Sequence, residues 1–203
     1  TGPRKKLKKK GEKPLSTIVV KEKNRDFINE AFRVVRSNLE FALGYDTDKH
    51  VIMVTGIDVG AGKTFLSLNL ANVLGLKGKK VILLDLDLRK ASLSESVNLK
   101  GEGMSNYLIG QVTDYHQLIQ HQDHIDILPC GTLPPNPTEL LYSIRLKQLI
   151  EELHSQYDYV IIDCPPVEII ADAAIINQYV DMTLFVIRTE VTDRSILNEL
   201  EQW

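Results

Sequence analysis

The segment Val51-Ile-Met-Val-Thr-Gly-Ile-Asp-Val-Gly-Ala-Gly-Lys-Thr64 leads from an apolar run into a glycine-containing loop and ends where a helix-favouring stretch begins. Gly60 and Gly62 allow the backbone to wrap closely around a phosphate group with its N–H groups pointing inward. The positive N-terminal end of the following helix favours the same anion. The pattern G-x-x-x-x-G-K-[ST] would require glycine where this chain has Ile57. The order of strand, loop, Lys-Thr and helix still favours a phosphate-binding loop over an ordinary glycine turn.

Such a loop predicts a nucleotide site with a bound magnesium ion. Lys63 would neutralise charge on the β- and γ-phosphates, and the Thr64 hydroxyl would bind Mg²⁺. The residues expected to contact the nucleotide are Asp58, Val59, Gly60, Ala61, Gly62, Lys63, Thr64 and Phe65.

Two further apolar runs end in aspartates. The string Val81-Ile-Leu-Leu-Asp85-Leu-Asp87-Leu-Arg89 places two carboxylates at i and i+2, on one face of a strand. Close carboxylates repel unless a cation neutralises them, so we expect Mg²⁺ here and one aspartate free to accept a proton. The sequence does not separate Asp85 from Asp87 in these roles. Tyr159-Val-Ile-Ile-Asp163 supplies a third acid that would orient Mg²⁺ or its water.

Short apolar runs alternate with amphipathic stretches along the chain. The expected strands are 51–55, 80–84, 125–128, 159–162 and 183–187, and the expected helices are 26–42, 64–74, 105–120, 138–155 and 172–178. Runs of Val, Ile and Leu with little alternation are typical of strands buried on both faces of a parallel sheet. The chain therefore predicts an α/β fold, with a doubly wound, mostly parallel sheet, helices on both faces and ligands at the carboxyl ends of the strands.

The first expected helix is amphipathic at about 100° per residue. Its broad apolar face would dock onto the domain, and that face comprises Phe27, Ile28, Ala31, Phe32, Val34, Val35, Leu39 and Phe41. The opposite face would display a charged stripe that includes Glu30, Arg33 and Arg36.

Charge is distributed unevenly. The whole chain has a net charge of −3, whereas residues 1–14 alone contain seven basic side chains and one glutamate. We expect residues 1–25 to form a basic linker and residues 26–203 to form the folded domain. An acidic domain disfavours nucleic-acid binding. The two cysteines, Cys130 and Cys164, exclude a disulfide scaffold.

The three motifs, in this order, resemble those of the bacterial P-loop tyrosine autokinases (BY-kinases), which control capsule and exopolysaccharide export. In that family the phosphate loop commonly lacks its first glycine, and the string from Asp85 to Arg89 matches the second motif, Walker A′. Glu30-Ala-Phe-Arg33-Val-Val-Arg36 fits the E-x-x-R-x-x-R pattern through which these kinases assemble into rings. The MinD- and ParA-type ATPases share the fold, but they carry a lysine where this chain has Asp58.

The resemblance implies ATP- and Mg²⁺-dependent transfer of the γ-phosphoryl group to tyrosines of a C-terminal tail, in trans within a ring. It implies the following roles: Lys63 at the phosphates; Thr64, Asp85 and Asp163 around the metal; Asp87 or Asp85 as proton acceptor; Arg89 at the phosphate or the incoming tyrosine; Glu30, Arg33 and Arg36 in ring assembly. No tyrosine follows Tyr179, so we expect the tail to lie beyond this chain.

The resemblance also implies partners. These are further copies of the chain in an octamer-like ring, the tyrosine tail, the polysaccharide export machinery, a cognate tyrosine phosphatase and, through a preceding transmembrane segment outside this chain, the membrane. The expected location is the cytoplasmic domain of an inner-membrane protein, with the basic linker beside the membrane. Two other functions remain open: a nucleotide-gated assembly switch without kinase activity, and a MinD/ParA-like ATPase.

Overall fold

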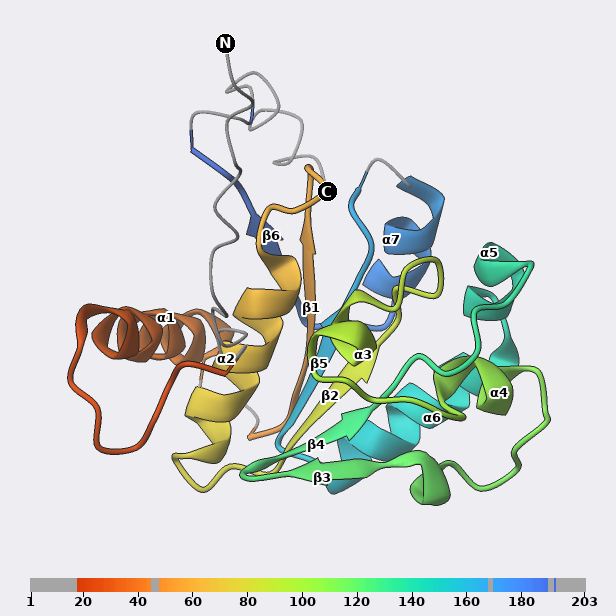
Figure 1. The fold of residues 1–203 in the computed structure, drawn as a ribbon, viewed down its shortest axis with the longest axis horizontal. Helices are drawn as coiled ribbons and strands as arrows, with labels where there is room; N and C mark the ends of the chain where they lie inside the picture. The colour runs from red at the N-terminus through yellow and green to blue at the C-terminus, as the bar shows by residue number, and fades with distance from the viewer. Residues whose placement is uncertain (1–17, 45–47, 168–169, 190–191, 193–203) are drawn as a thin grey trace, which may run out of the picture.

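The computed structural model describes residues 18–44, 48–167, 170–189 and 192, and these residues form a layered α/β fold around one sheet. The strands are β1 (His50–Gly56), β2 (Val81–Asp85), β3 (Gln120–Gln122), β4 (Ile125–Leu128), β5 (Tyr159–Asp163) and β6 (Met182–Val186). Their order across the sheet is β3-β4-β2-β5-β1-β6, and only the β3–β4 pair is antiparallel (Figure 1). The predicted doubly wound, mostly parallel sheet is confirmed.

The central strands are buried on both faces. Every residue of β1, β2 and β5 is buried. Along β1, Val51 and Met53 belong to one apolar core, whereas Ile52 and Val54 belong to the other. Because successive side chains point to opposite faces, an uninterrupted apolar run fills two cores at once.

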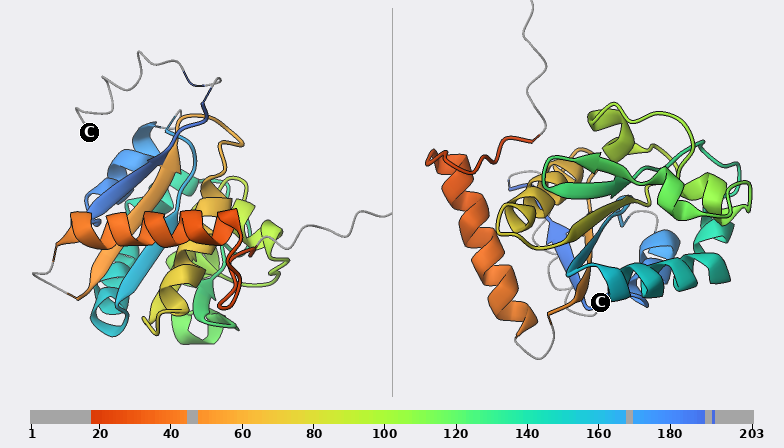
Figure 2. Two further views of the ribbon diagram at one scale, coloured as in Figure 1. Left: turned by 90° about the vertical axis from the view of Figure 1, so that its left-hand side faces the viewer. Right: turned by 90° about the horizontal axis from the view of Figure 1, so that it is seen from below.

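The helices divide between the two faces of the sheet. They are α1 (Phe27–Leu43), α2 (Lys63–Gly75), α3 (Ser92–Ser96), α4 (Met104–Leu108), α5 (Pro137–Leu141), α6 (Ile144–Gln156) and α7 (Ile170–Asn177). The α2 helix covers one face with α1 packed outside it, and α6 and α7 cover the other face (Figures 1 and 2). Within the described ranges, no helix is long and apolar enough to cross a bilayer.

Two of the expected helices are interrupted. The stretch 105–120 is not one helix, because α4 is followed by Gly110 at φ 83° before a 3₁₀ turn (Tyr115–Leu118) leads into β3. The stretch 138–155 is divided between α5 and α6. Ser143 caps α6 by accepting a hydrogen bond from the Leu146 N–H. The polar strand β3 was not expected, since an edge strand with exposed side chains has no apolar pattern to reveal it.

The prediction of a broad buried apolar face on α1 is wrong. Phe27, Val34 and Phe41 are 87%, 58% and 78% exposed. Phe32 and Leu39 are the buried apolar residues of this helix. The α1 helix therefore contacts α2 through a narrow stripe and not through half of its circumference.

Residues 18–21 lie across α2 as a strap, and a turn at Glu22 and Lys23 then leads the chain to α1. The Asn69 side-chain oxygen accepts hydrogen bonds from the N–H groups of Val19 (2.9 Å) and Val20 (3.2 Å). The Asn72 side-chain amide donates to the Val20 carbonyl at 2.8 Å. Packing thus begins ahead of residue 26, and residues 1–17 of the predicted linker lie outside the described residues.

Candidate active site

The predicted phosphate loop connects β1 to α2 at the carboxyl edge of the sheet. Gly60 and Gly62 have φ angles of 78° and 99°, a region that disfavours side chains, and Gly62 is the N-cap of α2. At Gly56, an added Cβ would lie 2.6 Å from the Val186 carbonyl oxygen of β6. The glycine that precedes the expected motif position therefore has a structural role, because it lets β1 and β6 approach.

Asp163, at the end of β5, holds the first turn of α2. The Thr64 hydroxyl donates to its Oδ2 at 2.7 Å, and the Ser67 hydroxyl donates to its Oδ1 at 2.9 Å. Asp163 is 1% exposed, and burial raises its pKa to about 6 despite these donors. Ser67 was not among the predicted site residues, although its position one helical turn after Thr64 predicts a shared face.

Lys63 lies in the same cluster of charges. Its Nζ donates to the Asp58 carbonyl at 3.3 Å. Burial lowers the pKa of Lys63, while the nearby carboxylates of Asp163 and Asp87 oppose that effect. The Asp58 carboxylate accepts a hydrogen bond from the Thr192 hydroxyl at 2.5 Å, which joins the loop to the segment after β6.

These groups surround a pocket of about 210 Å³. Its lining residues are Val59, Gly60, Gly62, Lys63, Thr64, Phe65, Asp87, Lys90, Ser92, Cys164 and Pro166. Five of the predicted site residues do not line it: Asp58, Ala61, Asp85, Arg89 and Asp163. Lys90 and Ser92 were not predicted: Lys90 lies in the turn after β2, and Ser92 is the first residue of α3.

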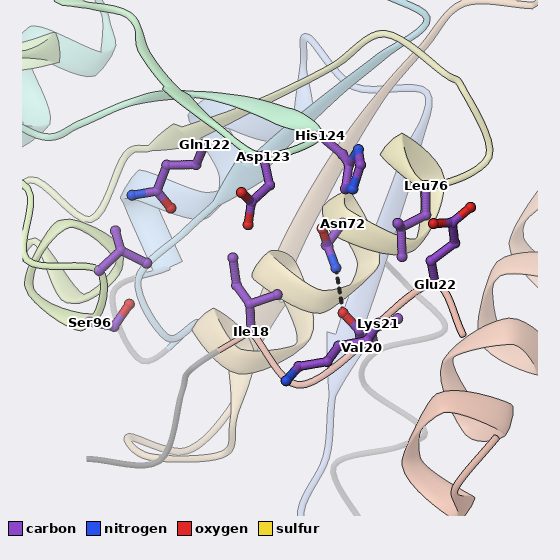
Figure 3. Close-up of a pocket in the computed structure, with 11 residues that line it drawn as sticks. Ile18, Val20, Lys21, Glu22, Asn72, Leu76, Ser96, Gln122, Asp123 and His124 are labelled. Atoms are coloured by element: carbon purple, nitrogen blue, oxygen red, sulfur yellow. Dashed lines mark hydrogen bonds between the residues drawn. The ribbon is translucent and has the colours of Figure 1, made fainter. Parts of the chain in front are cut away.

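A larger hollow of about 500 Å³ lies elsewhere, between the strap, α2 and the β3–β4 turn (Figure 3). Its lining contains none of the predicted site residues. The smaller pocket at the phosphate loop is therefore the candidate active site, because it alone of these two hollows combines the loop, the lysine and a carboxylate.

The structure separates the two aspartates of the second motif. Asp85 is fully buried; its Oδ2 accepts both the Ser94 N–H (2.8 Å) and the Ser94 hydroxyl (2.6 Å). Burial raises the pKa of Asp85 to about 7. Asp87 lines the pocket instead. The strand ends at Asp85, so its alternation no longer controls where Asp87 points.

Arg89 binds residues of α5 and α7. Its Nε and Nη2 donate to the two carboxylate oxygens of Asp172 at 2.9 and 3.4 Å, and Nη2 also donates to the Thr138 hydroxyl at 2.8 Å. Thr138 donates in turn to Asp172 at 2.7 Å. Arg89 thus joins the turn after β2 to α5 and α7.

The predicted assembly residues contact their own chain. Glu30 and Arg33 form an ion pair, and Arg33 also donates to the Asn24 carbonyl at 3.0 Å. The Arg36 side chain is only 15% exposed and lies 3.7 Å from Glu40. The charged stripe is therefore accessible mainly at Glu30 and Arg33.

The cysteines and Tyr159 are packing residues. Cys130 and Cys164 are buried, and burial raises the pKa of Cys130 to about 12 and that of Cys164 well above its usual range. Neither thiol has the depressed pKa of a reactive cysteine. Tyr159 is 4% exposed, which agrees with its expected place in the core.

Similarity to known proteins shows which family this chain belongs to. A profile described as an AAA domain matches residues 49–195. The tyrosine-protein kinase YwqD of Bacillus subtilis is 34% identical over 190 residues, which cover 92% of this chain and 79% of YwqD. The chain belongs to the bacterial tyrosine-kinase family.

A solved structure supports the same family. The kinase domain of the Escherichia coli tyrosine kinase ETK matches with a TM-score of 0.85 and 33% identity, over 98% of this chain and 78% of that domain. A Klebsiella pneumoniae relative, whose name places it in a cps region, is 40% identical over 189 residues. That match covers 92% of this bacterial tyrosine-kinase chain but only 26% of the relative.

The donor groups at the pocket of this bacterial tyrosine-kinase chain suit a magnesium ion. Hydroxyl and carboxylate oxygens are the ligands that Mg²⁺ prefers, and Thr64 and Asp163 present them 2.7 Å apart. Asp163, Asp85 and Asp87 repel one another, and the raised pKa values of Asp163 and Asp85 include that repulsion. A bound cation would relieve it, so this donor set suits a divalent metal.

Proposed function

We propose that this chain transfers the γ-phosphoryl group of ATP to tyrosine hydroxyls. The observation that carries the proposal is the pocket in which Lys63, Thr64 and Asp87 meet, with Asp163 directly behind Thr64. Membership of the bacterial tyrosine-kinase family supplies the acceptor class.

Each residue then has a defined task. The loop N–H groups and Lys63 would hold the phosphates, and Thr64 and Asp163 would hold the metal, in part through water. Bound Mg²⁺ would neutralise charge on the transferring phosphoryl group. Asp87 accepts or orients the proton of the tyrosine hydroxyl, because it is the aspartate of its pair that lines the pocket. Asp85 instead supports the backbone of the turn after β2, because its Oδ1 accepts the Asp87 N–H at 3.2 Å.

For the whole protein we propose the wider arrangement that the family resemblance implies. The acceptor would be a tyrosine-rich C-terminal tail of a neighbouring copy in a ring. The basic residues before position 14 would lie beside an anionic inner membrane. The controlled process would be capsule or exopolysaccharide export, with a tyrosine phosphatase reversing the modification.

Transfer of label from γ-labelled ATP to a random Glu–Tyr copolymer tests the activity. The wild-type chain should label tyrosine, and Lys63→Met and Asp87→Asn should not. Nucleotide-dependent assembly without any transfer would instead support the assembly switch. Free phosphate release stimulated by DNA or lipid would support the MinD/ParA-like ATPase.

Ring assembly has its own test. The double exchange Glu30→Arg with Arg33→Glu keeps an ion pair within α1, so the fold should be preserved. It reverses both charges presented to a neighbouring copy, and light scattering should then report a monomer. An unchanged oligomer mass would contradict a role for these residues in assembly.

A further inference from the structure

Ser92 lies where it can control the orientation of Asp87. The Ser92 hydroxyl donates a hydrogen bond to Asp87 Oδ2 at 3.1 Å, and both residues line the phosphate pocket. No motif recognised in the sequence includes Ser92, which follows Asp87 by five positions on the other side of the turn into α3.

The two oxygens of the Asp87 carboxylate are held by different parts of the turn. Oδ1 accepts the backbone N–H groups of Lys90 (3.1 Å) and Arg89 (3.4 Å). Among the contacts found in the described residues, Oδ2 accepts only from the Ser92 hydroxyl. Two anchored oxygens prevent rotation about the terminal side-chain torsion, which is otherwise broad in aspartate.

The backbone is distorted in the way this contact requires. Ala91, between the turn and Ser92, has φ 50° and ψ 41°, a left-handed conformation that is unfavourable for a residue with a Cβ. The N–H of Ala91 donates to the Asp87 carbonyl at 2.8 Å, which folds the chain back so that Ser92 faces Asp87. Strained backbone at a functional site often holds a reactive group in place.

We propose that Ser92 is a positioning residue for phosphoryl transfer, which holds Asp87 Oδ2 toward the acceptor hydroxyl. This inference rests on the proposed kinase function. The tyrosine oxygen forms a bond to the γ-phosphorus while the bond from that phosphorus to the ADP oxygen breaks. The proton of the tyrosine hydroxyl moves to the remaining lone pair of Asp87 Oδ2. Ser92 itself exchanges no proton and does not contact the phosphoryl group.

The proposal predicts a separation of kcat from KM. With the Glu–Tyr copolymer as acceptor, Ser92→Ala should lower kcat about three- to tenfold, the range expected from one lost hydrogen bond. The KM values for ATP and for the copolymer should stay within about twofold, because Lys63, Thr64 and Asp163 are untouched. Ser92→Thr keeps the hydroxyl and should restore kcat.

Ser96→Ala is the matched control. Ser96 belongs to the same short helix, its hydroxyl donates to the Leu93 carbonyl at 2.7 Å, and it does not line the phosphate pocket. It should leave kcat unchanged, and urea midpoints should show that all three variants are folded. An unchanged kcat in Ser92→Ala, an equal loss in Ser92→Thr, or a loss confined to the KM for ATP would overturn the positioning role. A wild-type chain that transfers nothing would instead refute the kinase function itself, and the inference with it.

Discussion

Replacement of Asp163 by asparagine tests how burial changes the stability contribution of this carboxylate. Asp163 is 1% exposed, and burial raises its pKa to about 6. In the unfolded chain, an aspartate pKa lies near 4. Two pKa units correspond to about 3 kcal/mol, so above pH 7 the ionised carboxylate destabilises the metal-free fold by up to about that amount.

The direction of this pH dependence of stability follows from how many protons each state binds. Below about pH 4 both states are protonated, and Asp163 contributes no difference. As the pH rises, the unfolded chain releases this proton first, so the folded state binds more protons and stability falls. The loss is complete once the folded carboxyl has also ionised, at about pH 7. Asp163→Asn removes the titration but keeps the oxygen that Thr64 or Ser67 can donate to.

Urea unfolding in the presence of EDTA at pH 5 and pH 8 measures the effect. Relative to wild type, Asp163→Asn should gain more free energy of unfolding at pH 8 than at pH 5, by about 1–2 kcal/mol. Asp123→Asn serves as the control, because Asp123 is exposed in a turn at φ 44°, a conformation that asparagine tolerates. A gain in Asp163→Asn that is equal at the two pH values would refute burial as the cause.

Three further predictions concern stability and packing. Arg89→Ala should lower the free energy of unfolding by about 2–3 kcal/mol in urea titrations, because it leaves the Asp172 carboxylate, which is 2% exposed, without its charged partner. Asp172→Asn should cost less, because the Arg89 side chain is 37% exposed and can be hydrated. Gly56→Ala should lower the free energy of unfolding by about 1–3 kcal/mol in thermal unfolding, since its Cβ would force β6 away; no loss would mean that the strands can shift freely. Asn72→Ala should speed tryptic cleavage at Lys21 in the strap, and an unchanged rate would show that the bond to the Val20 carbonyl does not hold it.

The sheet and the phosphate loop could be predicted from sequence because local patterns determine them. Unbroken apolar runs predict strands buried on both faces, and β1, β2 and β5 follow that rule. The two interrupted helices were predicted as continuous because apolar spacing was the signal used for them. Gly110 and Ser143 lie inside stretches of suitable apolar spacing, and their turn and capping geometry outweighs that spacing.

Long-range contacts could not be predicted in the same way. The side chains of Asn69 and Asn72 bind a strap about 50 residues earlier in the chain, and no periodicity predicts such a pair. The α1 helix shows the same limit: its pattern allows a wide apolar face, but α2 offers only a narrow contact, so Phe27 and Phe41 stay exposed.

The different roles of Asp85 and Asp87 depend on where the strand ends. Asp85 is the last residue of β2, so its side chain follows the alternation of the sheet and meets Ser94 in the buried layer. Asp87 belongs to a turn that Ala91 closes through its left-handed conformation, and that turn directs it into the pocket. Two aspartates two positions apart thus differ because one obeys strand geometry and the other obeys turn geometry. A sequence motif records the spacing of the two acids, but it does not record the residue at which the strand stops.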